Sequence, residues 1–289
     1  MARWLIDHQD AASGGWYCDF EYPYASLDEK LPKHWLSAMS QGQAASLLSR
    51  ACHATQDALY ERAAVKAIQP FKFEIENGGV TRPFVLPGGA QAAGLQFYEE
   101  YPTQAPSYVL NGFMFALLGL FDVSQIPDAD AALLFQRGMQ TLDVALLLYD
   151  LGYGSSYDLV HLVRPSAPVN DPSTYHLLHI VLLNALGTAS HDTKLLSYRD
   201  RWNSYGTKIG VWRLYLRRVG VWLVLRNPVV SFAGASAALL LFLAAVSACA
   251  RPLHTLNGRG LSARRLARHS VPTYSLTTST AMKSILTRA

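Results

Sequence analysis

Three short segments of the chain concentrate side chains that can exchange protons. They lie where helical patterns break off, and each combines tyrosine with a carboxylate or a histidine. The segments are Tyr98-Glu99-Glu100-Tyr101, Tyr157-Asp158 with His161, and Tyr175-His176 with His179. The pKa values of such groups, ordinarily near ~4.3 for a carboxylate and ~10 for a phenol, shift with burial and neighbouring charges. We therefore expect one site built from three loops.

The same segments predict no metal and no cofactor. His176 and His179 lie on nearly one helix face, but their spacing supplies two ligands and no third. Cys18, Cys52 and Cys249 show no metal-ligand spacing. For any single tyrosine taken alone, packing or sugar stacking is the better prediction than catalysis.

Helical periodicity indicates which elements position these segments. Apolar residues recur at three- and four-residue spacing. The helices expected from this pattern cover 35–53, 57–68, 107–121, 129–149, 174–186 and 192–205. Paired glycines and several prolines in 70–105 predict an irregular excursion with short strands, and LGYGSSYDLVHLV (151–163) reads as a second, hairpin-like piece. We expect residues 1–206 to form a mainly α domain, an α/α-toroid (incomplete α/α barrel) with short β-hairpin excursions.

Charge divides the chain into two parts. Residues 1–206 hold 13 basic and all 21 acidic residues, a net charge of −8, whereas the remaining 12 basic residues follow without an acidic one. Proteins that bind nucleic acid present basic surfaces to phosphate. The acidic part therefore argues against a nucleic-acid partner, and the two parts are expected to meet different environments.

The C-terminal part predicts attachment to a membrane. Residues 229–250 carry no charge and, at ~1.5 Å per residue, are long enough to cross a bilayer core of ~30 Å as a transmembrane helix. We expect a basic amphipathic juxtamembrane segment at 207–228 and a basic, disordered tail at 251–289. The alternative for 229–250 is a buried hydrophobic hairpin. The expected location is a Golgi or secretory-pathway membrane in a eukaryote and the cell envelope in a bacterium, although MARWLIDHQD lacks the features of a signal peptide.

Four stretches of the sequence resemble successive landmarks of the D-glucuronyl C5-epimerases. In order they are WLSAMSQGQA (35–44), FYEEYPT followed by SYVLNGFMFALLGLFD (97–122), RGMQTLDVALLLYDLGYGSSYDLVH (137–161) and TYHLLH (174–179). The resemblance runs from about Trp4 to Tyr205. It implies epimerisation at C5 of D-glucuronate to L-iduronate within a heparan- or heparosan-like polysaccharide, with one proton carrier for each face of the sugar. A homodimer is compatible with the resemblance.

The resemblance also assigns the candidate site residues. The family's catalytic positions correspond to Glu100, Tyr101, Tyr157 and Tyr175. Of these, Glu100 and Tyr175 are expected to form the opposed acid–base pair. The residues expected to bind substrate are Asn111, His161, His176, His179 and Arg164.

One position departs from the family pattern. Many relatives carry Arg between the Leu and the His of YDLxH, where this chain has Val160. Arg164 lies four residues further on and compensates only if the loop folds that way. The missing Arg and the net charge of −8 together favour an unsulfated or sparsely sulfated uronan as substrate.

Two alternatives from other classes stay open at this stage. A uronan lyase would form the same C5 carbanion and expel the O4 substituent by β-elimination, which creates an unsaturated, ultraviolet-absorbing sugar. A non-catalytic, membrane-anchored glycan-binding protein would use the same residues for binding alone.

Overall fold

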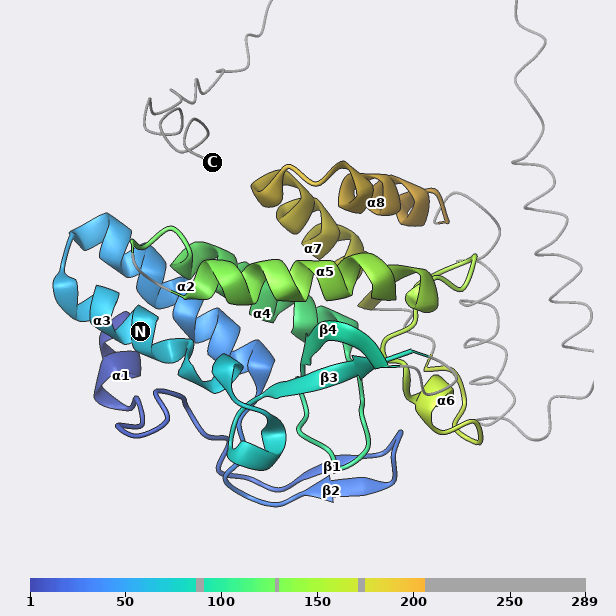
Figure 1. The fold of residues 1–289 in the computed structure, drawn as a ribbon, viewed down its shortest axis with the longest axis horizontal. Coiled ribbons are helices and arrows are strands. Elements are labelled where there is room, and N and C mark those ends of the chain that lie inside the picture. The colour runs from blue at the N-terminus through green and yellow to red at the C-terminus, as the bar shows by residue number, and fades with distance from the viewer. Residues whose placement is uncertain (87–90, 128–129, 171–174, 206–289) are drawn as a thin grey trace, which may run out of the picture. The chain divides into compact units, whose positions relative to one another are not determined.

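The computed structural model describes residues 1–86, 91–127, 130–170 and 175–205, all within the unit Met1–Asn227 (Figure 1). The α-helices of these residues are α1 (Ala2–Asp7), α2 (Ala38–Thr55), α3 (Ala58–Ala67), α4 (Leu110–Val123), α5 (Ala131–Tyr149), α6 (Val160–Val163), α7 (Tyr175–Ser190) and α8 (Thr193–Tyr205). Short 3₁₀ turns lie at Gln69–Lys72 and Ile75–Asn77.

Local sequence sets the ends of the first helix pair. The hydroxyl of Ser37 accepts a hydrogen bond from the backbone N–H of Ser40 and caps α2, which ends where Gln56 adopts a left-handed conformation. The carboxylate of Asp57 then caps α3 by accepting from the N–H of Leu59 at 2.8 Å. The helix pair predicted for 35–53 and 57–68 is confirmed.

Helix α4 forms the centre of the core. Ten of its 14 residues are buried, and it packs against α2, α5, α7 and β4. In Figure 1, α5 runs across α4, with strands β3 and β4 along one side and α7 and α8 on the other. Helices α2 and α4 cross so closely that a side chain at Gly42 would overlap the backbone of Ala116. This close approach explains the glycine there.

Two antiparallel hairpins accompany the helices. Strand β1 (Tyr22–Tyr24) pairs with β2 (Glu29–Leu31), with Tyr22 opposite Leu31. Strand β3 (Thr81–Val85) pairs with β4 (Gln91–Tyr98), with Thr81 opposite Tyr98. The second hairpin confirms the strands predicted within 70–105, and its last residue, Tyr98, leads directly into Glu99 and Glu100.

The predicted fold class needs correction. The described residues are mainly helical, but they do not show an α/α toroid, because the helices pack around the buried α4 instead of standing in a ring. No α-helix in these residues is both long and apolar enough to cross a membrane. The longest, α5, carries Arg137 and Asp143. The predicted transmembrane helix at 229–250 lies outside the described residues, as do the segments 207–228 and 251–289.

Candidate functional site

Glu100 is positioned between β4 and α4. The backbone there is held by hydrogen bonds from the N–H of Glu99 to the carbonyl of Val80 at 2.8 Å and from the N–H of Ala38 to the carbonyl of Glu99 at 2.9 Å. The side chain of Glu100 is only 4% exposed and lies against the first turn of α4. A side chain at Gly112 would overlap the Glu100 carboxylate, so the glycine makes room for the acid.

The surroundings of Glu100 raise the pKa of its carboxyl group to near neutral pH. Burial and, to a smaller extent, the charge of Glu99 raise the pKa of Glu100, and a hydrogen bond with Tyr101 lowers it. The net pKa is about 7. The Oε2 atom of Glu100 is buried and has no hydrogen-bond partner among the described residues. A carboxyl group with such a pKa and one free oxygen can take or give a proton at neutral pH.

Tyr101 stands in a stack of aromatic rings. Its ring lies parallel to that of Tyr22, at 4.8 Å between centroids and 3° between planes, and it also contacts Tyr24 and Trp35 at 5.0 and 6.0 Å. Burial raises the pKa of Tyr101, and the nearby charge of Glu100 raises it further. The hydroxyl of Tyr101 therefore keeps its proton and acts as a hydrogen-bond donor.

Tyr157 and Tyr175 extend the row of hydroxyl groups. The loop carrying Tyr157 is fixed because its N–H donates to the carbonyl of Asn170 and its carbonyl accepts from the N–H of Leu110, both at 3.0 Å. Burial and the charge of Glu100 raise the pKa of Tyr157. The Tyr157 ring lies 4.6 Å from that of Tyr175, which begins α7 and is 41% exposed. The structure thus brings the four residues predicted to be catalytic into one row.

The β1–β2 hairpin contributes residues that sequence reasoning missed. The hydroxyl of Tyr24 donates to Oδ2 of Asp158 at 2.8 Å, and the buried Asp158 also accepts from the Asn170 side chain at 3.1 Å and the N–H of Val160 at 3.2 Å. These bonds tie the hairpin, which carries Tyr22, to the loop of Tyr157. The aromatic density of WYCDFEYPY was the signal in the sequence that could have identified this element.

Asn111 and His161 have buried polar atoms that face no partner. Neither Oδ1 of Asn111, in the first turn of α4, nor Nδ1 of His161, on α6, has a hydrogen-bond partner among the described residues. Burial lowers the pKa of His161, an effect that the charge of Asp158 opposes. Unpartnered buried polar atoms are costly unless a ligand satisfies them, so both positions suit the substrate contacts predicted for them.

The other three residues predicted to bind substrate are engaged within the protein. His176 is buried and His179 is fully buried, and the Nδ1 atoms of both rings contact the hydroxyl of Ser155, whereas Nε2 of His179 has no hydrogen-bond partner among the described residues. Arg164 is exposed and donates from Nη1 to the carbonyl of Leu27 at 2.8 Å. Their substrate contacts stay predictions.

Val160 lies in a small apolar cluster with Tyr24, Leu27 and Val109, against which Tyr101 and Tyr157 pack. An apolar side chain at this position therefore supports the aromatic stack.

Glu99 lies next to Glu100 but meets different surroundings. Its fully buried carboxylate accepts from the hydroxyl of Ser107 at 2.8 Å and the N–H of Tyr108 at 3.1 Å, and pairs with Arg82 at 3.4 Å. Burial raises the pKa of Glu99, and Arg82 and these hydrogen bonds oppose this effect. The net pKa is about 7. Every partner of Glu99 belongs to the fold, which indicates a structural role.

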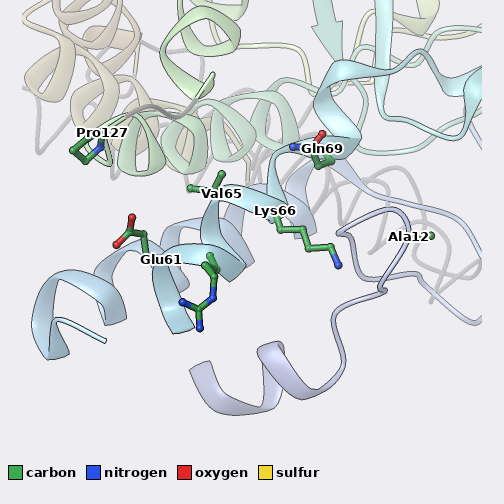
Figure 2. A pocket seen from close by; sticks show the side chains of 7 residues that line it. Ala12, Glu61, Val65, Lys66, Gln69 and Pro127 are labelled. Carbon is green, nitrogen blue, oxygen red and sulfur yellow. The ribbon is translucent and has the colours of Figure 1, made fainter. Parts of the chain in front are cut away.

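A separate pocket of about 690 Å³ lies beside α3, lined by Ala12, Glu61, Arg62, Val65, Lys66, Gln69 and Pro127 (Figure 2). None of these residues belongs to the predicted site, and the pocket offers no aromatic ring to a sugar. Across the described ranges, no three His, Cys, Asp or Glu side chains are grouped so that they could hold a metal ion.

The fold and the site define a class of protein, a helical domain that holds a buried carboxyl group with an unpartnered oxygen beside tyrosine side chains. Residues 9–204 match the family model described as D-glucuronyl C5-epimerase C-terminus. The chain belongs to this family. It is 36% identical over 217 residues to a D-glucuronyl C5-epimerase of Caenorhabditis elegans, which covers 71% of this chain and 34% of that protein.

A second relative is an uncharacterized protein of Methanocaldococcus jannaschii, 29% identical over 199 residues. This match covers 68% of the present chain and 59% of the archaeal protein. The chain therefore spans about a third of the length of the nematode relative and under two thirds of that of the archaeal one.

Proposed function

We propose that this protein is an isomerase that epimerises C5 of D-glucuronate residues to L-iduronate within a heparan- or heparosan-like polysaccharide. The observation that carries the proposal is Glu100, a buried carboxyl group with a pKa of about 7 and an unpartnered Oε2. The similarity to the nematode D-glucuronyl C5-epimerase supports the same reaction. The exposed ring of Tyr175 offers a face on which a sugar ring can stack.

In the first step, Oε2 of Glu100 takes the proton from C5 of glucuronate. The C5–H electron pair moves into the adjacent carboxylate, which becomes a dianionic enediolate. Such charge is stabilised by hydrogen-bond donors placed in advance. Tyr101 and Tyr157 are suited to this task because their raised pKa values keep their hydroxyl groups protonated.

In the second step, Tyr175 donates its hydroxyl proton to C5 from the opposite face, which gives iduronate and leaves a tyrosinate. The proton on Glu100 and the charge on Tyr175 must then be reset before the next turnover. Because Tyr175 is 41% exposed, its hydroxyl can exchange protons with water, so hydrogen from solvent is expected at C5 of the product.

The charges around the site favour a substrate with little or no sulfate. Arg82 pairs with Glu99, Arg164 donates to the carbonyl of Leu27, and Val160 provides no charge. The net charge of −8 over residues 1–206 would repel a heavily sulfated chain. We propose that neutral donors, including the hydroxyl groups of Tyr101 and Tyr157, bind the uronate carboxylate.

The test is incorporation of deuterium at C5 when the full chain is incubated in heavy water with unsulfated or N-sulfated heparosan. We expect exchange and iduronate formation, faster with the unsulfated polymer, and loss of both in Glu100→Gln and Tyr175→Phe. An ultraviolet-absorbing product would make the protein a lyase and overturn the proposal. Absence of exchange from a folded chain with either polymer would overturn it as well.

A further inference from the structure

Ser155 joins two parts of the candidate site that are distant in sequence. It is fully buried in the loop between α5 and α6, two residues before Tyr157. Its hydroxyl lies 2.9 Å from Nδ1 of His176 and 2.7 Å from Nδ1 of His179, both on α7. Because His176 directly follows Tyr175, Ser155 links the loop that carries one tyrosine to the helix that carries the other.

The hydrogen bonds fix the protonation of His176. The backbone N–H of Ser155 donates to Nδ1 of His176 at 3.1 Å, so this nitrogen carries a lone pair. The proton of the ring is therefore on Nε2, which lies 3.2 Å from the carbonyl of Trp202 and donates to it. If His176 were doubly protonated, Nδ1 would carry a proton and could no longer accept the hydrogen bond from the N–H of Ser155.

His179 is held neutral in the same cluster. Burial and, to a smaller extent, the neighbouring His176 lower the pKa of His179 to about 3. Because Nδ1 of His176 carries no proton, the Ser155 hydroxyl donates to it and accepts from the protonated Nδ1 of His179. His179 therefore stays neutral across the pH range in which Glu100 changes charge.

We propose that Ser155, His176 and His179 position Tyr175 against Tyr157 for the second proton transfer. This inference rests on the proposed function. The centroids of the two tyrosine rings lie 4.6 Å apart, and the anchored side chains lie within four residues of these tyrosines along the chain. Both ring nitrogens of His176 and the Nδ1 atom of His179 are bound within the protein, which suits a positioning role, while Nε2 of His179 has no hydrogen-bond partner among the described residues.

The cost of losing this network follows from the demands of proton transfer to carbon. Reacting groups must be held close to the productive geometry, and a displacement of about 1 Å can cost roughly 10²-fold in rate. A positioning residue should therefore affect kcat, whereas a residue that binds the sugar equally before and during the reaction should affect KM.

The experiment compares side chains that retain or lose one nitrogen position. Asn at 179 places its amide near the position of Nδ1, and Gln at 179 places it near that of Nε2. We expect Ser155→Ala and His179→Gln to lower kcat by about 10- to 100-fold with little change in KM. His179→Asn should retain kcat within about threefold of the unchanged chain, because it keeps the contact with Ser155.

Ser49→Ala is the matched control, because Ser49 is a buried serine on α2 whose hydroxyl donates to the carbonyl of Asp122 at 2.8 Å. It should lower the melting temperature as Ser155→Ala does but leave kcat unchanged. Equal losses in His179→Asn and His179→Gln would overturn the proposal, as would a raised KM with unchanged kcat.

A second readout does not depend on turnover. Nuclear Overhauser effects between the ring protons of Tyr157 and Tyr175, measured in the full chain with labelled tyrosine, report their contact directly. We expect these signals to weaken in Ser155→Ala and His179→Gln and to persist in His179→Asn and Ser49→Ala. If the unchanged chain shows no C5 exchange, the proposed function fails, and these signals still decide whether the network positions Tyr175.

Discussion

Glu99 and Glu100 are neighbours in the chain, but their carboxylates lie in two contrasting regions of the molecule. Burial raises the pKa of both to about 7. The region around Glu99 satisfies it with Arg82 and with donors from Ser107 and Tyr108, whereas the region around Glu100 leaves Oε2 without a partner beside tyrosine hydroxyls. A perturbed pKa alone therefore does not identify a reactive group. The unused hydrogen-bonding capacity of Glu100 makes the difference.

The largest expected effect separates the two acids by activity. Glu100→Gln removes the proposed proton acceptor, so kcat for C5 exchange should fall by about 10³-fold while the fold persists. The measurement is deuterium incorporation at C5, with circular dichroism to confirm folding. If Glu100→Gln retained more than about a tenth of the rate, Glu100 would not be the base.

The next effect concerns stability. Glu99→Gln breaks the pair with Arg82 and presents an NH₂ group to donors from Ser107 and Tyr108. The free energy of unfolding should fall by about 3 kcal/mol. Urea denaturation of both variants measures this difference, and an equal loss in Glu100→Gln would remove the contrast between the two acids.

The pH dependence of stability sharpens the comparison. The pKa of Glu100 in the folded chain, about 7, lies above its ordinary value of 4.5. The folded state therefore binds this proton more tightly, and the cost of charging Glu100 grows as the pH rises from 4.5 to 7 and is constant above that. Glu100→Gln removes this cost, so its stability relative to the unchanged chain should increase over this interval by up to about 3 kcal/mol. Urea denaturation at pH 4.5, 6 and 8 tests the sign, which is contradicted if the difference shrinks with rising pH.

The smallest expected effect uses the glycine that makes room for Glu100. Gly112→Ala would push the carboxylate aside, so kcat should fall about tenfold although alanine favours the helix. Gly187→Ala, on α7, is the matched control, because a side chain there meets the flexible Leu196 side chain and the carbonyl of Asp192. If Gly112→Ala and Gly187→Ala had the same kcat, the space that Gly112 leaves beside Glu100 would not be critical for activity.

Several features of the fold could be predicted because they depend on local sequence. The helices expected at 129–149 and 192–205 are observed as Ala131–Tyr149 and Thr193–Tyr205. Their apolar spacing is a property of a few consecutive turns, and it survives whatever the partner is. The prediction of an α/α toroid was wrong because the arrangement of helices depends on which helix faces pack together. The burial of most of α4 does not follow from the spacing of its apolar residues alone.

The candidate site could be predicted in part for the same reason. The motifs carried Glu100, Tyr101, Tyr157 and Tyr175, and the structure brings them together. The bonds from Tyr24 to Asp158 and from Ser155 to His179 join residues far apart in the chain, and no periodicity reports such contacts. The sequence showed only that a positive charge is missing at Val160, and the structure adds that this side chain lies in the apolar cluster against which Tyr101 and Tyr157 pack.

The sequence by itself determined the helices, the strands within 70–105, the charge of the domain and the candidates for the proton carriers. Tertiary structure alone decided which of two adjacent glutamates is free to react. Solvation and hydrogen bonding set the reactivity of a carboxyl group, and both depend on residues that folding brings from distant parts of the chain. For Glu99 these are Arg82 and the Ser107–Tyr108 backbone, and for Glu100 they are Gly112 and the tyrosines.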